Sequence, residues 1–215
     1  MATTLIFIRH GESEGNLRHI FLGQQNMPLT PLGKRQAALT AEFLRDTPIN
    51  AVYASDLTRA MMTAEPVARQ KGLAIQPETG LREIFAGAWE MKTYEEIAER
   101  FPEDYQCWRE DIGRVRCTEG ESTAELQRRV KDTLESIVRR HAGQTVCVVT
   151  HATALRSIKC AWYGLPVERM NEVPWPRNAS VTTVRYEDDG SVTMLLDDEV
   201  SQLGNEVTVV SKSIR

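Results

Sequence analysis

The chain has 215 residues, of which 41% are hydrophobic and 26% are charged, and its formal net charge is −4 at neutral pH. This composition is typical of globular proteins and excludes a collagen, a coiled coil and an intrinsically disordered chain. The length suits one hydrophobic core, so we expect a single domain over residues 1–215.

The charge and the apolar runs also bear on partners and location. A small negative charge provides no basic surface for nucleic acid or an anionic membrane. The longest apolar run near the start, Leu5–Ile8, is far shorter than the roughly 20 residues of a membrane-spanning helix. Met1–Thr4 lack the basic and apolar regions of a secretory signal. The four cysteines form no C-x-x-C pair, and Cys147 lies in an apolar run typical of a buried thiol. We expect a soluble, reduced, cytoplasmic protein with a small-molecule partner; no pattern indicates an oligomeric state.

Strands and helices alternate along the first hundred residues. Thr3–Ile8 is a nearly all-apolar run, typical of a parallel strand that is buried on both faces. Thr30 and Pro31 are a typical N-cap and first helical residue, and predict a helix to about Arg45. The further predictions are a strand at Ala51–Ala54, a helix from Asp56 with a kink at Pro66, a strand at Leu73–Gln76, and helices at Thr93–Arg100 and Glu103–Asp111. Residues 82–118 interrupt the alternation and predict a small helical cap.

The second half of the chain contains the strongest helix signal. Ser122 and Glu125 have capping-box spacing, and Gly143 follows the predicted end of this helix. The apolar positions at helical spacing are Leu126, Val130, Leu134, Ile137 and Val138. Next come a strand at Thr145–Val149, a helix at Ala152–Tyr163, and a hairpin of Val181–Tyr186 with Ser191–Leu196. After Glu199 no element is predicted. The order predicts an α/β fold: a three-layer sandwich with a mostly parallel central sheet, helices on both faces and a small helical cap insertion.

Two predicted strands end on a histidine followed by a small residue. The first ends Ile8-Arg9-His10-Gly11, and the later one ends Val149-Thr150-His151-Ala152. Ligands bind at the carboxyl edge of open α/β sheets, so two neighbouring parallel strands would bring His10 and His151 together. The alternative is that the two histidines are unrelated, one in a turn and one near a helix start.

Two arginines complete a candidate anion site. Arg9 precedes the first histidine, and Arg59 lies one turn into the helix after the second strand. A guanidinium offers paired donors that suit phosphoryl oxygens. Taken alone, Arg59 is better explained by a solvated helix face or by an ion pair with Asp56 than by an anion site. Together with two histidines, the arginines favour a site for a phosphate dianion.

These residues belong to a series of motifs that resembles the histidine phosphatase superfamily, which includes the cofactor-dependent phosphoglycerate mutases. The matching blocks, in order, are Arg9-His10-Gly11-Glu12-Ser13 with Asn16, Pro28–Gly33 with Gln36-Ala37, Ser55–Ala60 with Thr63-Ala64, Leu81-Arg82-Glu83 with Gly87 and Trp89-Glu90, Glu119–Ser122, and Thr150-His151. Each block is weak alone, but their common order over about 150 residues is a strong signal.

The resemblance implies a covalent mechanism without a metal or another cofactor. His10 is the implied nucleophile, because a neutral imidazole can attack phosphorus and divide the displacement into two steps. Its ordinary pKa near ~6.5 leaves it neutral at cytoplasmic pH, and a backbone carbonyl near Gly11 would fix its tautomer. Arg9, Arg59 and a cationic His151 would neutralise the phosphoryl oxygens. Asn16 is an implied neutral donor, and Gly11 permits close backbone approach. Ser13, Gly23 and Ala152 are the remaining expected substrate contacts.

Glu83 is the implied general acid, which protonates the leaving oxygen and later deprotonates water. Its apolar neighbours, among them Ile84 and Trp89, would favour the protonated carboxyl by desolvation. The alternative for Glu83 is a salt bridge, for instance with Arg82. The rival carboxyls are Glu12 and Glu121, and we expect Glu121 and Ser122 to serve mainly in helix capping.

Three departures from the mutase pattern favour hydrolysis. Mutases tend to have arginine where this chain has Ile84 and threonine where it has Leu22, and their substrate-gripping insertion is longer than residues 89–120. Many family members also have glycine at the position of Ala152. We therefore expect a phosphomonoester hydrolase that acts through phosphohistidine on a small phosphorylated metabolite.

The alternatives are a mutase-type isomerase, a catalytically idle binding protein and a metal hydrolase that uses both histidines as ligands. The substrate stays open among sugar phosphates, phosphoglycerates, a ribazole phosphate and phospho-amino acids. We expect residues 85–117 to select it through an aromatic wall drawn from Trp89, Tyr94, Phe101, Tyr105 and Trp108.

Overall fold

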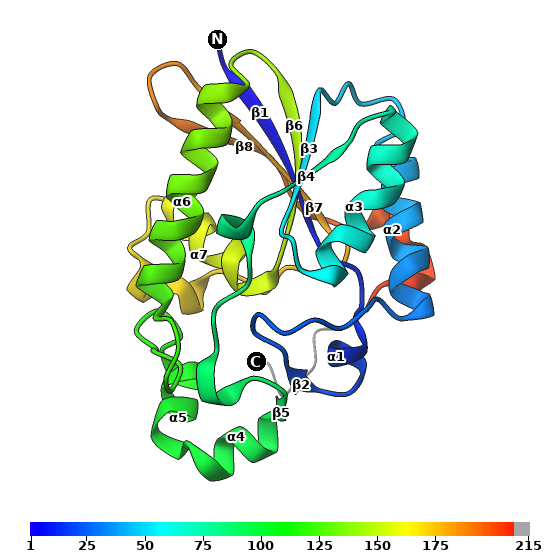
Figure 1. Ribbon diagram of the computed structural model, residues 1–215. Coiled ribbons are helices and arrows are strands. Elements are labelled where there is room, and N and C mark those ends of the chain that lie inside the picture. The colour runs from blue at the N-terminus through cyan, green and yellow to red at the C-terminus, as the bar shows by residue number, and fades with distance from the viewer. Residues whose placement is uncertain (209–215) are drawn as a thin grey trace.

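A six-stranded sheet with the order β4-β3-β6-β1-β7-β8 runs through the computed structural model, which describes residues 1–208 (Figure 1). Its strands are β1 (Thr3–Arg9), β3 (Ala51–Ala54), β4 (Ile75–Pro77), β6 (Thr145–Thr150), β7 (Val181–Tyr186) and β8 (Val192–Glu199). The first four are mutually parallel, β7 is antiparallel to β1, and β8 is antiparallel to β7. The prediction of a mostly parallel sheet is therefore confirmed.

Helices cover both faces of this sheet. Figure 1 shows α2 (Pro31–Phe43) and α3 (Thr58–Lys71) on one side, and α6 (Thr123–Arg140) and α7 (Ala152–Trp162) on the other. Alternate residues of β1 serve the two cores: Leu5 and Phe7 pack with α6 and α7, whereas Ile6 and Ile8 pack with α2 and α3. Both sets are buried, which explains the unbroken apolar run and confirms the three-layer sandwich.

Helix ends follow the local sequence signals closely. The Ser122 side chain accepts from the Glu125 N–H, and the Glu125 carboxylate accepts from the Ser122 N–H, which completes the capping box of α6.

The predicted third strand begins at Ile75 rather than Leu73. Gly72 ends α3 in the left-handed conformation (φ +65°), and the Leu73 N–H still bonds to the Ala68 carbonyl, so the chain extends only after that turn.

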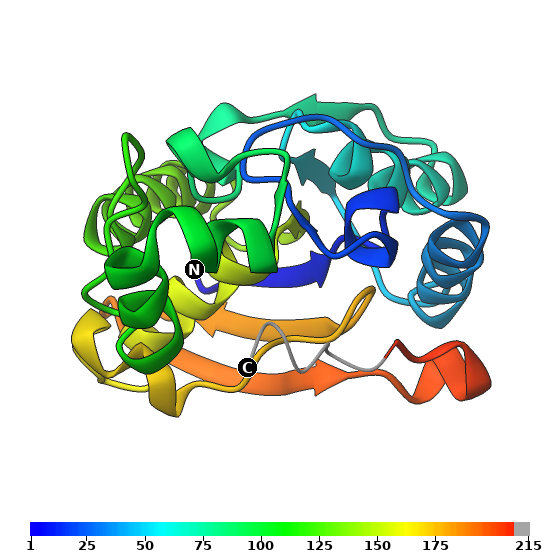
Figure 2. The same ribbon diagram turned by 90° about the horizontal axis from the view of Figure 1, so that it is seen from below.

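A second, smaller layer lies beyond the carboxyl edge of β1 and β6. It contains α1 (Glu14–Leu17), β2 (Ile20–Phe21), the short helix η2 (Gly87–Trp89), β5 (Lys92–Thr93), α4 (Tyr94–Arg100) and α5 (Pro102–Glu110). The short helix η1 (Thr79–Leu81) follows β4 and packs against α6. Seen from below in Figure 2, α1, α4 and α5 stand in front of the sheet. Helices in the region 82–118 were predicted; the antiparallel pairing of β2 with β5 was not.

An aromatic cluster holds this layer together. The ring of Phe21 lies 5.6 Å from that of Trp89 and 4.9 Å from that of Trp108, measured between centroids. Trp89 is fully buried, so it belongs to the core of the layer. Edge-to-face pairs of this kind stabilise beyond the area they bury.

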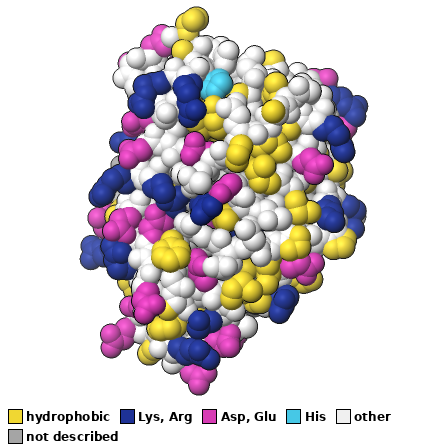
Figure 3. Space-filling view, in the orientation of Figure 1, with side chains coloured by type: hydrophobic (Ala, Val, Ile, Leu, Met, Phe, Trp, Pro, Cys, Tyr) yellow, Lys and Arg dark blue, Asp and Glu magenta, His cyan; other side chains and the backbone are white. Residues whose placement is uncertain are grey.

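Short helical turns follow α7 and β8. These are η3 (Val167–Glu172) and η4 (Ser201–Glu206), where the sequence predicts no element. The Gln36 side chain of α2 donates to the Glu206 carbonyl and ties η4 to the sandwich. The remainder of the tail, residues 209–215, lies outside the described residues. Within residues 1–208 no helix is both long and apolar enough to cross a bilayer. Figure 3 shows acidic and basic side chains interspersed on one face, with no broad field of either sign.

Candidate active site

The register of two parallel strands places His10 beside His151. Arg9 of β1 pairs with Thr150 of β6, and each histidine is the next residue of its chain. The His10 N–H donates to the Thr150 carbonyl at 3.0 Å, and the two imidazole centroids are 5.2 Å apart. The helices that follow these strands pack on opposite faces, so the pair stands at a topological switch point, where ligands bind in open α/β sheets.

The imidazole of His10 is held in one tautomer. Its Nδ1 lies 2.7 Å from the Gly11 carbonyl oxygen, and because a carbonyl only accepts, Nδ1 carries the proton. Burial, Arg59 and Arg9 hold the pKa of His10 well below its ordinary value of 6.5. The ring is therefore neutral near pH 7, with its lone pair on Nε2. The acceptor expected near Gly11 is the carbonyl of Gly11 itself.

Two buried guanidiniums flank this imidazole. Arg9 and Arg59 are 5% and 2% exposed, and burial lowers the pKa of Arg59 to about 10. Arg9 donates to the Pro176 carbonyl, and Arg59 donates to the carbonyls of Gln25 and Gly23 at 2.8 Å. Within residues 1–208, neither forms a salt bridge with a carboxylate. Buried charges without a counter-ion are costly, which makes this pair a site for an anion.

The alternative partner of Arg59 is occupied elsewhere. Asp56 forms a bidentate ion pair with Arg82, which lowers the pKa of Asp56. The expected alternatives for Arg59, a solvated helix face or an ion pair with Asp56, are therefore wrong. The same pair removes Arg82 as a salt-bridge partner of Glu83.

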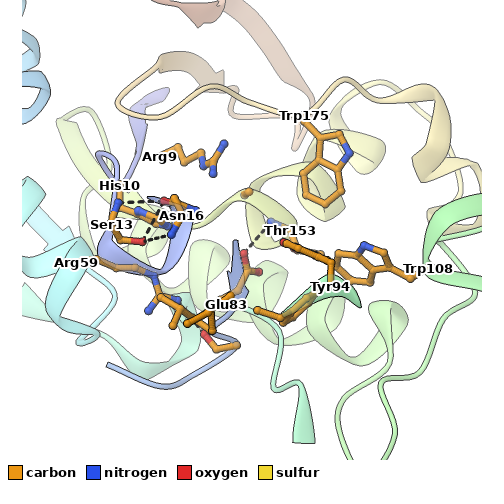
Figure 4. Close-up of a pocket in the computed structure, with 15 residues that line it drawn as sticks. Arg9, His10, Ser13, Asn16, Arg59, Glu83, Tyr94, Trp108, Thr153 and Trp175 are labelled. Carbon is orange, nitrogen blue, oxygen red and sulfur yellow. Dashed lines mark hydrogen bonds between the residues drawn. The ribbon is translucent and has the colours of Figure 1, made fainter. Parts of the chain in front are cut away.

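The carboxylate of Glu83 sits at the start of α7. Its Oε1 accepts from the N–H groups of Ile84 (2.9 Å) and Ala154 (3.2 Å), and its Oε2 accepts from the Thr153 N–H at 3.0 Å (Figure 4). The expectation of apolar surroundings is wrong at the carboxylate itself, because backbone donors surround it. The segment is anchored to β6, whose Thr150 hydroxyl donates to the Leu81 carbonyl at 2.8 Å.

The rival carboxyls point to other partners. Glu12 Oε1 accepts from the Thr30 hydroxyl at 2.7 Å, and Glu121 pairs with Arg129 at 2.8 Å. Neither residue lines the cavity described below. Of the three carboxyls named from sequence, the structure brings only Glu83 to the histidine pair.

The amide of Asn16 is oriented by its neighbours. Its Oδ1 accepts from the Ser13 N–H at 3.1 Å, the Ser13 hydroxyl at 3.0 Å and the Asn178 side chain at 3.3 Å. With the oxygen taken by three donors, its NH₂ group is left to donate into the cavity. Ser13 lines the cavity, but its hydroxyl caps α1. Asn178 also donates to the His10 carbonyl at 3.0 Å, and sequence reasoning missed it because no motif marks it.

His151 is fully buried next to His10 and is not among the residues that line the cavity described below. Its Nε2 is 2.8 Å from the Ser55 hydroxyl, and its Nδ1 is buried without a partner among residues 1–208. Burial, Arg59 and His10 hold the pKa of His151 well below 6.5. The expectation of a cationic His151 is therefore wrong for the protein on its own, because the imidazole is fully buried and Arg59 disfavours a second positive charge.

Two glycines are required by close backbone contacts. A Cβ at Gly11 would lie 2.6 Å from the Gly33 carbonyl oxygen, and one at Gly33 would lie 2.0 Å from the Glu12 carbonyl oxygen. Gly11 therefore permits α2 to pack closely against the histidine loop, which confirms the expected close backbone approach. Gly23 has a φ of +52°, and its carbonyl accepts from Arg59.

The cavity in front of His10 has a polar end and an aromatic end. It is lined by Arg9, His10, Ser13, Asn16, Ile20, Phe21, Leu22, Gly23, Arg59, Glu83, Tyr94, Trp108, Ala152, Thr153 and Trp175. Figure 4 shows Arg9, His10 and Arg59 at one end, Tyr94, Trp108 and Trp175 at the other, and Glu83 between them.

Part of the predicted aromatic wall is present. Tyr94 and Trp108 line the cavity, whereas Trp89 belongs to the core, and Phe101 and Tyr105 are partly buried against that core. Trp175 and Thr153 were missed, because neither lies in the predicted cap or in a recognised motif.

Comparison with known proteins places the geometry in context. The chain matches the family model of the histidine phosphatase superfamily (branch 1) over residues 5–199. It is 35% identical over 196 residues to phosphoserine phosphatase 1 of Hydrogenobacter thermophilus, covering 90% of this chain and 91% of that one. It is 34% identical to the probable phosphoglycerate mutase GpmB of Yersinia enterocolitica, with 86% and 85% covered. The solved structure of YhfR from Bacillus stearothermophilus superposes with a TM-score of 0.90 at 31% identity, covering 94% and 99%.

Proposed function

This chain belongs to the histidine phosphatase superfamily, and from that premise we propose that it hydrolyses phosphomonoesters of small metabolites through a phosphohistidine at His10. One observation carries the proposal: a neutral imidazole of fixed tautomer lies beside two buried guanidiniums that lack a carboxylate partner. In this proposal residues 1–215 act as one domain, and residues 82–118 act as its cap.

The first step is an in-line displacement at phosphorus. The Nε2 lone pair of His10 attacks, a P–N bond forms, and the bond from phosphorus to the alcohol oxygen breaks. Arg9, Arg59 and the Asn16 amide bind the phosphoryl oxygens, whose charge replaces the counter-ion that the guanidiniums lack. Such charge stabilisation in a pre-arranged site is usually the largest catalytic contribution.

Glu83 donates a proton in the first step and accepts one in the second. Its Oε2 receives one backbone N–H and its Oε1 receives two, so Oε2 is the oxygen with room for a proton. From there the proton passes to the departing alkoxide, and the alcohol leaves. Water then attacks the phosphohistidine, Glu83 takes the water proton, and the P–N bond breaks to release inorganic phosphate and neutral His10.

His151 supports the transferred group from behind. The Ser55 hydroxyl accepts from the Leu57 N–H, so its own hydrogen can be donated to His151 Nε2. This arrangement leaves the proton of His151 on the unpartnered Nδ1, where it can be donated to a phosphoryl oxygen. A bound dianion would also raise the pKa of this imidazole from its depressed value.

Hydrolysis is favoured over phosphoryl return to substrate, although one similar protein is named a mutase. Ile84 stands where mutases tend to have arginine. Among the described residues that line the cavity, only Arg9 and Arg59 carry a permanent positive charge. Because these arginines and His10 provide the charge and the nucleophile, we propose that the enzyme needs no metal. Its four free cysteines, three of them buried, support a reduced cytoplasmic location.

Trapping the intermediate tests this function. The enzyme is mixed with a ³²P-labelled aryl phosphate in the presence of EDTA and quenched in base after milliseconds. We expect label on the protein that is stable to base and labile to acid, as a phosphoramidate is. His10→Ala should lose the label and phosphate release, whereas the exposed control His19→Asn should keep both. Label that is stable to acid, or full turnover in His10→Ala, would refute the proposal.

A further inference from the structure

The cavity wall beyond Glu83 is aromatic. Tyr94, Trp108 and Trp175 gather opposite Arg9 and His10, and Figure 4 shows Glu83 between the two groups. In the proposed function Glu83 protonates the leaving oxygen. The leaving alcohol therefore extends from the phosphoryl group past Glu83 and meets these three rings.

One of the rings is fixed by a buried cation. The guanidinium carbon of Arg156 lies 4.0 Å from the centroid of Trp175, and the Arg156 residue is 3% exposed. Arg156 also donates to the carbonyls of Val173 (2.9 Å) and Met170 (2.8 Å), which holds the segment that carries the tryptophan. Arg156 does not line the cavity, whereas Trp175 does. A flat apolar surface is therefore in place before a ligand binds, which reduces the ordering cost of binding.

No cation lines the aromatic end of the cavity, because the guanidinium of Arg156 stacks on Trp175 and is not part of the lining. Among the described lining residues the only arginines or lysines are Arg9 and Arg59, at the phosphoryl end. The nearby Arg129 is paired with Glu121 and donates to backbone carbonyls. A carboxylate on the leaving alcohol would lose its hydration here, beside the carboxyl group of Glu83 and with no cation of the cavity wall in contact with it.

Trp108 adds a polar feature to the wall. Its indole N–H is buried and has no partner within residues 1–208, although other atoms of the ring line the cavity. The wall thus suits a ring that is uncharged and carries at most neutral polar atoms.

We infer that the preferred substrates are phosphomonoesters of an uncharged alcohol with a flat ring, and that esters with a carboxylate near the phosphoryl group are poor substrates. The inference rests on the proposed function, and it makes Trp175, Trp108 and Tyr94 the residues that determine specificity.

Three alkyl esters separate ring recognition from charge. Benzyl phosphate carries the ring, glycerol 3-phosphate carries neither ring nor carboxylate, and 3-phosphoglycerate replaces a hydroxymethyl group of the latter with a carboxylate. We expect kcat/KM for phosphate release to fall about tenfold from benzyl phosphate to glycerol 3-phosphate through loss of aromatic contact. A further fall of about tenfold or more to 3-phosphoglycerate is expected from the unpaired carboxylate.

Variants of the wall locate the preference. Trp175→Ala should lower kcat/KM for benzyl phosphate about tenfold and leave that for glycerol 3-phosphate within about twofold, while Trp175→Phe should restore most of the loss. Phe43→Ala is the matched control, because Phe43 is an aromatic residue of α2 that is 42% exposed and outside the cavity. Equal losses on both esters in Trp175→Ala would overturn the inference.

Binding to His10→Ala distinguishes this inference from the proposed function. By calorimetry, benzyl phosphate should bind to this variant about tenfold more tightly than 3-phosphoglycerate. Equal binding of the two esters, or their equal turnover by the native enzyme, would overturn the inferred substrate preference but leave the proposed hydrolase function intact. Absence of turnover with every ester would instead overturn the proposed function, and this inference with it.

Discussion

Lowering the pH from 7 to 5 should destabilise the folded chain through the imidazoles of His10 and His151. Both are buried, and burial together with Arg59 holds their pKa values well below 6.5 in the folded state. In the unfolded chain they titrate near ~6.5. Between these values the unfolded state binds more protons than the folded state, so the free energy of unfolding falls as the pH falls.

The size of the effect follows from the same pKa values. At pH 5 an unfolded histidine with a pKa near ~6.5 is almost fully protonated, which stabilises the unfolded state by about 2 kcal/mol per group. At pH 7 protonation stabilises the unfolded state by only about 0.2 kcal/mol per histidine. Two buried imidazoles that stay neutral should together remove about 4 kcal/mol, a large part of a typical stability of ~5–15 kcal/mol.

Urea unfolding at pH 7 and pH 5, in buffers free of phosphate, measures this loss. The His10→Asn/His151→Asn double variant is the reference, because carboxylates and exposed histidines contribute equally to both proteins. We expect the native chain to lose about 4 kcal/mol more than the double variant, with each single variant in between. A native chain that loses no more stability than the double variant would refute the assignment of two neutral, buried imidazoles.

Three other substitutions have distinct expected outcomes. Glu83→Gln should slow hydrolysis of an alkyl phosphate by about 10²–10⁴-fold and that of an activated aryl phosphate far less, because a phenolate departs without a proton donor; equal slowing in steady-state and burst kinetics would exclude Glu83 as the acid. Asn178→Leu should lower kcat/KM about tenfold, since the bonds to the His10 carbonyl and to Asn16 are lost; unchanged kinetics in a folded variant would contradict this role. Gly33→Ala should lower the free energy of unfolding in urea by about 2–3 kcal/mol, because its Cβ would lie 2.0 Å from the Glu12 carbonyl oxygen. The control Gly164→Ala should lower it by only about 1 kcal/mol, because φ is +68° there but the space is open.

Features set by near neighbours in the chain could be predicted from sequence. The capping box at Ser122 and Glu125 involves residues one helical turn apart, and the apolar run Thr3–Ile8 reflects burial on both faces. The ordered motif blocks pointed to His10, Arg9, Arg59 and Glu83, and the structure lines one cavity with all four. Alternation of strands and helices was sufficient for the fold class, because it leaves few ways to bury every apolar face.

Contacts between distant segments were decided only by the tertiary structure. The insertion of β6 between β1 and β3 makes His10 and His151 neighbours, and the Arg9–Thr150 register sets how closely they approach. Burial, with Arg59 and His10 nearby, lowers the pKa of His151 and favours the neutral imidazole, whereas the mechanism implied by the resemblance suggested a cation. Asn178 and Trp175 join the site from a loop before β7 that carries no motif. Strand order, burial and side-chain partners depend on residues that are far apart in the chain, and no local pattern encodes them.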